Sequence, residues 1–138
     1  MSDAFVLDAC ALIALLHMEE GGDAVYDLFL QAKDNKVALS MNKLNLLEVY
    51  YDVFRRDGEA LALQIIQMVD DSPIRIISEI SDDVFKEAGR LKASCKISLA
   101  DSIALAEASA SGGTLVTCDH HEFEAVEKSQ PIKFLWLR

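Results

Sequence analysis

Three acidic residues, far apart in the sequence, stand where they could act together. Asp8 directly follows a short apolar run, Asp119 follows a second such run with one residue between, and Asp101 lies in the first turn of an alanine-rich segment. If the two runs are parallel strands, ligands collect beyond their carboxyl ends. Carboxylates gathered there would form an oxygen-only ligand set, which favours Mg²⁺ or Mn²⁺ over zinc.

Each of these three acids also has a purely structural interpretation. Asp8 and Asp119 open predicted helices, where a carboxylate accepts hydrogen bonds from free backbone N–H groups. The run Ser98 to Asp101 (SLAD) matches a capping box, the reciprocal hydrogen-bonding pattern of a helix start. Taken singly, helix capping is the simpler interpretation for each acid.

Glu48 does not fit the capping interpretation. It falls in the middle of a predicted helix, among neighbours that include Leu47, Val49 and Tyr50. A carboxylate buried among such residues needs a partner, because its removal from water is unfavourable. The alternative is a surface glutamate on a polar stripe of the helix with Asn45.

Hydrophobic periodicity and breaker residues divide the chain into alternating strands and helices. We expect strands at residues 5–7, 37–39, 74–77, 114–117 and 133–137, and helices at residues 9–17, 23–33, 42–56, 59–69, 81–92, 98–111 and 119–127. The alternation predicts an α/β fold, a single three-layer α/β/α domain over residues 1–138 with a mostly parallel central sheet. The alanine-rich helix should pack centrally on the sheet and end at Gly112 and Gly113.

The charge of the chain argues against simple binding of nucleic acid by bulk attraction. The formal net charge is −10, whereas proteins that coat nucleic acid are usually basic. If the substrate is a nucleic acid, bound cations must supply much of the positive charge.

The cysteines and the amino-terminal segment bear on where the protein works. Cys10, Cys95 and Cys118 form an odd set with no paired spacing, which predicts reduced thiols rather than a disulfide framework. The uncharged stretch 9–16 is too short to span a bilayer. We therefore expect a cytoplasmic protein without a signal peptide or membrane anchor.

The ordered set of features resembles PIN-domain ribonucleases, including the toxin subunits of VapBC-type toxin–antitoxin systems. The features are a strand followed by Asp8, a helical Glu48, the run 98–102 (SLADS), and Thr117, Cys118 and Asp119 with Phe123 following. The resemblance extends over essentially the full chain. It implies a PIN-like fold with a Mg²⁺- or Mn²⁺-dependent site that hydrolyses RNA phosphodiester bonds.

The resemblance also assigns roles to residues. Asp8, Glu48 and Asp101 would bind the metal directly or through water, Asp119 would complete the cluster or hold a second ion, and Thr117 would be a supporting hydroxyl. Four carboxylates brought together repel one another, and a cation relieves that repulsion. An antitoxin segment would bind an apolar groove on the helical hairpin 42–69, and the protein would be a homodimer.

One departure from the family pattern concerns the cysteines. The family often has Asp-x-Ser or Asp-x-Thr after the first strand, whereas this chain has Asp8-Ala9-Cys10. A thiol is a weaker hydrogen-bond donor than a hydroxyl. With Cys118 beside Asp119, the hypothesis is that Cys10 and Cys118 both lie near the site and that their oxidation affects activity.

Two other classes of protein compete with this interpretation. A phosphatase of the haloacid dehalogenase type needs a second Asp two residues after the first, and this chain has Cys10 there. A receiver domain needs an Asp after the third strand, and residues 74–78 contain none. A PIN-like interaction module without catalysis would be expected to lose the acids, yet all four are present.

Overall fold

Strands and helices alternate along the chain, as the sequence predicts. The computed structural model describes residues 3–138, so the first two residues of the predicted domain lie outside the described part. The strands are β1 (Asp3–Leu7), β2 (Val37–Asn42), β3 (Arg75–Ile77), β4 (Thr114–Thr117) and β5 (Lys133–Trp136). The helices are α1 (Ala9–Leu16), α2 (Gly22–Lys33), α3 (Lys43–Asp57), α4 (Glu59–Asp70), α5 (Asp82–Ser94), α6 (Leu99–Ser111) and α7 (His120–Ser129).

The five strands form one parallel sheet in the order β3-β2-β1-β4-β5. The chain builds outward from β1 to β3 on one side and then returns to add β4 and β5 on the other. The order therefore reverses between β1 and β4, and parallel sheets commonly bind ligands beyond the carboxyl ends of the strands at such a reversal. Asp8 and Asp119 follow these two strands.

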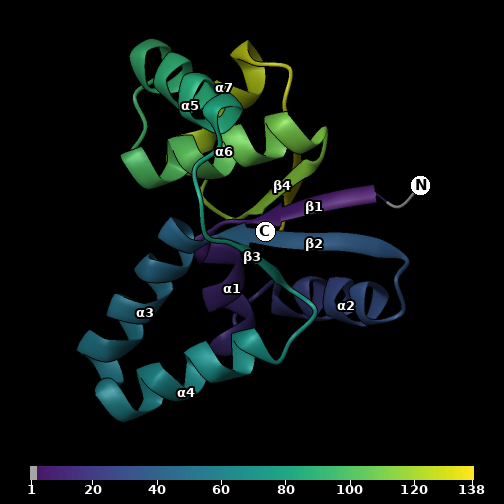
Figure 1. Ribbon diagram of the computed structural model, residues 1–138, viewed down its shortest axis with the longest axis vertical. Helices are drawn as coiled ribbons and strands as arrows, with labels where there is room; N and C mark the ends of the chain where they lie inside the picture. Colours follow the sequence, from purple (N-terminus) through teal and green to yellow (C-terminus); the bar gives the residue numbers. More distant parts are fainter. Residues whose placement is uncertain (1–2) are drawn as a thin grey trace.

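Helices cover both faces of the sheet. In Figure 1, α1 to α4 lie on one side of the sheet and α5 to α7 on the other. Side chains along each strand alternate between the two cores, so that Val6 and Leu115 pack with α5 to α7, whereas Leu7 and Val116 pack with α1 to α4. The prediction of a three-layer α/β/α fold is confirmed.

Helix α6 is central, as its alanine content predicts. Ala104, Ala106 and Ala108 are completely buried, and the helix packs against β1, β2, β4, α3 and α5. It ends at Gly112, whose φ of 65° is a left-handed conformation that glycine adopts without strain. Small side chains thus let α6 pack closely on the sheet.

The main boundary difference lies in β2. The sequence predicts a strand over 37–39, whereas β2 continues to Asn42 because Ser40, Met41 and Asn42 pair with β3. Polar residues in a short strand hide this extension from a hydrophobicity pattern. Among residues 3–138, no helix is long and apolar enough to cross a membrane.

Asn42 connects the end of β2 to two helices. Its side-chain oxygen accepts a hydrogen bond from the backbone N–H of Leu44 and caps α3. Its amide donates to the carboxyl group of Glu107 on α6, with 2.8 Å between the two atoms. Both side chains are buried, and this bond joins the layers on opposite faces of the sheet.

We expect Asn42→Ala to lower the free energy of unfolding by about 2–4 kcal/mol. Loss of a helix cap costs about 1 kcal/mol, and a buried carboxyl group left without its donor costs about 1–3 kcal/mol. Asn42→Ser is the matched control, because serine keeps the cap and loses only the bond to Glu107. Urea unfolding measures the difference, and equal stability of the alanine variant and the parent would contradict the assignment.

Candidate functional site

Asp8 is the most buried acid of the predicted site. It caps α1 by accepting a hydrogen bond from the backbone N–H of Ala11, 2.8 Å away, through one carboxylate oxygen. The other oxygen accepts a hydrogen bond from the hydroxyl of Thr117. Only 2% of Asp8 is exposed, and burial is the main reason that its pKa is raised to about 7. Capping and a place in the acidic site are therefore compatible here.

Thr117 links the ends of β1 and β4. Its side chain is fully buried and donates to Asp8, while its oxygen accepts the backbone N–H of Asp119 at 3.0 Å. The resemblance implies that Thr117 is a supporting hydroxyl, and here that hydroxyl contacts both Asp8 and the backbone of Asp119.

Asp101 and Glu48 come from different helices toward the same place. Burial is the main reason that the pKa of Asp101 is raised to about 7, and the charges of Asp119, Glu122 and Glu48 contribute to that rise. Burial also raises the pKa of Glu48, as does the charge of Asp119. Glu48 is half-buried and interacts electrostatically with Asp101 and Asp119.

Asp119 is the acid that interacts with all three others. It raises the pKa values of Asp8, Glu48 and Asp101, so its carboxylate is near each of them. It also caps α7 by accepting the backbone N–H of Glu122, at 3.2 Å. The structure therefore brings the four predicted residues to one edge of the sheet. Glu122 is near Asp101 as well as being part of the helix start.

Asn45 is a member of this region that sequence reasoning missed. Its side chain is fully buried, and its amide donates to the backbone oxygen of Ala100, at 3.0 Å, beside Asp101. Hydrogen bonding from Asn45 also lowers the pKa of Glu48. Asn45 thus joins the helix that carries Glu48 to the start of α6. The side-chain oxygen of Asn45 is a buried acceptor that has no hydrogen-bond donor among the described residues.

The prediction of reduced thiols is wrong for two of the three cysteines. Cys10 and Cys118 form a disulfide, and Cys95 is free. The fold brings residues 108 positions apart to a Cα–Cα distance of 6.1 Å, within the range that a disulfide needs. Sequence spacing could not reveal this pair, because only the packing of α1 against β4 brings the two residues together. The prediction that both lie near the acids agrees with the structure.

The residues of this edge fit a hard divalent cation by their chemistry. The ligand set consists of carboxylate oxygens that raise one another's pKa, and a cation between them would remove that repulsion. Within residues 3–138, no three His, Cys, Asp or Glu side chains are already arranged around one ion position.

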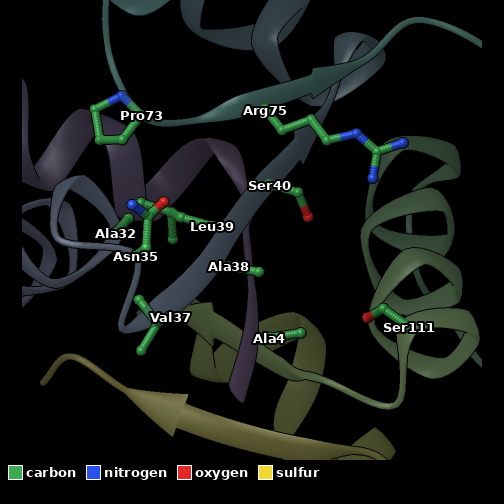
Figure 2. Close-up of a pocket in the computed structure, with 10 residues that line it drawn as sticks. All are labelled: Ala4, Ala32, Asn35, Val37, Ala38, Leu39, Ser40, Pro73, Arg75 and Ser111. Carbon is green, nitrogen blue, oxygen red and sulfur yellow. The ribbon is translucent and has the colours of Figure 1, made fainter. Parts of the chain in front are cut away.

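A hollow elsewhere in the molecule does not compete for this role. It has a volume of about 440 Å³ and is lined by Ala4, Val37 and Ala38, near the amino-terminal ends of β1 and β2. Figure 2 shows Arg75 of β3 extending across it toward the helix that carries Ser111. No carboxylate lines this hollow, whereas Asp8 and Asp119 follow the carboxyl ends of β1 and β4.

The fold and the acidic edge define an α/β/α protein whose carboxylates gather beyond the carboxyl ends of parallel strands. The model of the PIN domain family matches residues 5–129, and the chain belongs to this family. The resemblance read from the ordered acids is thereby confirmed. Among curated proteins, the sequence has no significant match.

Solved structures of toxin–antitoxin proteins share the fold. A DNA-bound VapBC from Salmonella typhimurium has a TM-score of 0.76 at 14% identity, with all of both chains covered. VapBC2 from Rickettsia felis, bound to a DNA fragment from its promoter, has a TM-score of 0.74 at 19% identity, covering 96% of this chain and 97% of that one. VapC20 from Mycobacterium tuberculosis, a toxin that cleaves the sarcin-ricin loop, has a TM-score of 0.62 at 18% identity, covering 88% and 94%.

The raised pKa values predict that the metal-free protein loses stability as the pH rises through about 7. Asp8 and Asp101 have pKa values of about 7 when folded, above their ordinary value of 3.8. Between those values the folded state binds more protons than the unfolded state, so acidification favours folding. We expect Asp8→Asn to remove the part of this pH dependence that comes from Asp8. The variant should therefore gain more stability over the parent at about pH 8 than at about pH 5.

Thermal unfolding in EDTA at both pH values measures this effect. Asp34→Asn is the control, because Asp34 is exposed and lies at the end of α2, away from the acids. An Asp8→Asn variant whose melting temperature depends on pH as the parent's does would show that Asp8 does not titrate in this range.

Proposed function

We propose that this chain is a cytoplasmic, divalent-metal-dependent ribonuclease, that it forms a single domain, and that it is the toxin of a toxin–antitoxin pair. The observation that carries the proposal is the set of mutually repelling carboxylates at the carboxyl edge of β1 and β4. Burying Asp8 and Asp101 beside like charges is unfavourable for a structural role alone. The arrangement becomes favourable if a cation is bound between them.

In this proposal the acids hold the metal ion. Asp8, Glu48 and Asp101 hold Mg²⁺ or Mn²⁺, and Asp119 completes the cluster. Thr117 keeps Asp8 oriented through its hydroxyl. When bound, the ion would act as a Lewis acid toward water and the phosphate, and it would offset the net charge of −10 that otherwise repels RNA.

An antitoxin partner is supported by the surface of the helical hairpin formed by α3 and α4. The hairpin carries the exposed apolar residues Leu47, Tyr51, Phe54, Leu61, Leu63 and Met68. A hollow of about 390 Å³, lined by residues that include Leu46, Tyr50 and Ile66, lies between this hairpin and β3. An amphipathic partner helix binds such grooves through its apolar face. Toxin–antitoxin complexes of similar fold favour this partner, and we also propose a homodimer.

The alternative is a PIN-like module that binds partners and does not cut. Such a module has no need for buried acids that destabilise the metal-free fold near neutral pH. The raised pKa values of Asp8 and Asp101 therefore favour the nuclease over the module.

We expect Asp8→Asn to reduce Mn²⁺-dependent cleavage of RNA by at least about a hundredfold, since removal of even an outer partner of a metal ligand lowers metal affinity or activity by about 10–100-fold. A fluorescently labelled RNA with single-stranded loops, incubated with and without EDTA, provides the assay. Glu107→Gln is the matched control, because Glu107 is a buried acid on the same helix as Asp101 but interacts with Asn42.

Cleavage that survives EDTA, or an Asp8→Asn variant as active as the parent, would contradict the nuclease assignment. Circular dichroism of each variant verifies that a loss of activity does not arise from unfolding. Equal losses in Asp8→Asn and Glu107→Gln would point to a general structural effect.

A further inference from the structure

A disulfide crosses the edge of the sheet where the acids meet. It joins Cys10, in the first turn of α1, to Cys118, in the connection between β4 and α7. Cys10 lies two residues after Asp8, and Cys118 lies between Thr117 and Asp119. The bond therefore ties together the two chain segments that carry half of the predicted metal ligands.

The same two segments are joined by hydrogen bonds. The backbone N–H of Asp8 donates to the oxygen of Val116 at 3.3 Å, and the Thr117 hydroxyl donates to the Asp8 carboxylate. Both oxygens of Asp8 therefore have protein donors, and one oxygen of Asp119 accepts the N–H of Glu122. A cation that binds these oxygens shares them with the protein donors, so the spacing of the two segments affects the geometry that the ion meets.

Oxidation limits how far these segments can adjust. With the disulfide formed, the start of α1 and the connection after β4 cannot shift independently. Without the disulfide, hydrogen bonds and the packing of α1 against β4 hold the segments together, and the segments can shift to suit a cation.

We propose that Cys10 and Cys118 form a redox switch that weakens divalent-cation binding when oxidised and releases the acidic site when reduced. This inference rests on the proposed metal-dependent function and adds its regulation. Both cysteines are half-buried, so a small thiol can reach the disulfide. In compartments that contain glutathione, disulfides are usually transient or redox-sensing rather than structural.

The chemistry of the switch needs only a low-molecular-weight disulfide such as oxidised glutathione. One cysteine thiolate attacks a sulfur of glutathione disulfide, forms a mixed disulfide and releases one glutathione thiolate. The second cysteine thiolate then attacks the protein sulfur of the mixed disulfide, closes the Cys10–Cys118 bond and releases the second glutathione thiolate. Two protein thiols are oxidised, one glutathione disulfide is reduced to two thiols, and two protons move from protein to glutathione.

The test measures Mn²⁺ affinity of the full chain by isothermal titration calorimetry after equilibration with reduced or oxidised glutathione. Maleimide labelling with mass spectrometry counts the free thiols in each sample. We expect one free thiol after oxidation, three after reduction, and Mn²⁺ affinity about tenfold higher in the reduced protein, at the lower end of what changes around metal ligands cause.

Variants separate the switch from other effects of oxidation. Cys118→Ser should bind Mn²⁺ as the reduced parent does and should not respond to glutathione, with Cys118→Ala as a second variant if the serine variant folds poorly. Cys95→Ser should keep the full redox response, because Cys95 is free and outside the disulfide.

Several outcomes would overturn the inference. These are equal or higher Mn²⁺ affinity in the oxidised protein, three free thiols after oxidation, or a redox response that persists in both Cys118 variants. Failure of the proposed function is recognised separately, because then Mn²⁺ binding of the reduced parent is absent or is unchanged by Asp8→Asn. If Asp8→Asn abolishes Mn²⁺ binding but oxidation leaves it unchanged, the redox switch is rejected and the proposed function is not.

Discussion

The burial of carboxylates beside one another at one edge of the sheet is the constraint on which the site depends. Asp8 and Asp101 have pKa values near 7 because they are buried and because other acids surround them. Near neutral pH, each ionised carboxylate makes ionisation of the next less favourable. A protein that keeps such a group must either hold protons on it or bind a cation there. The proposed function follows from the second of these possibilities.

The fold serves this arrangement by fixing the backbone from which each acid projects. The reversal of strand order between β1 and β4 brings Asp8 and Asp119 to one edge. The alanine-rich α6 packs closely on the sheet and delivers Asp101 to the same place. Asn45 holds α3 to the start of α6, so that Glu48 approaches from a third direction. The acids are thus supplied by separate elements whose positions are set by the core.

The sequence predicts the parts of this arrangement that depend on local pattern. Alternating strands and helices give the fold class, and the positions of Asp8 and Asp119 after strands give the edge. Glu48 joins the group only through the resemblance to the family, since a helix pattern alone does not tell which face is buried. Asn45 and the Cys10–Cys118 pair escape prediction because their contacts join residues 55 and 108 positions apart. No local pattern encodes such contacts, and the end of β2 is hidden for a related reason, since pairing with β3 extends it.

The most direct measurement is a crystal structure of the reduced protein soaked with Mn²⁺ near pH 8, with the ion located by its anomalous scattering. The account predicts an ion beyond the carboxyl ends of β1 and β4, with oxygens of Asp8, Glu48 and Asp101 bound directly or through one water, and direct distances on the order of 2 Å. An ion held elsewhere on the surface, with the Glu48 carboxylate turned away from Asp8 and Asp101, would contradict it.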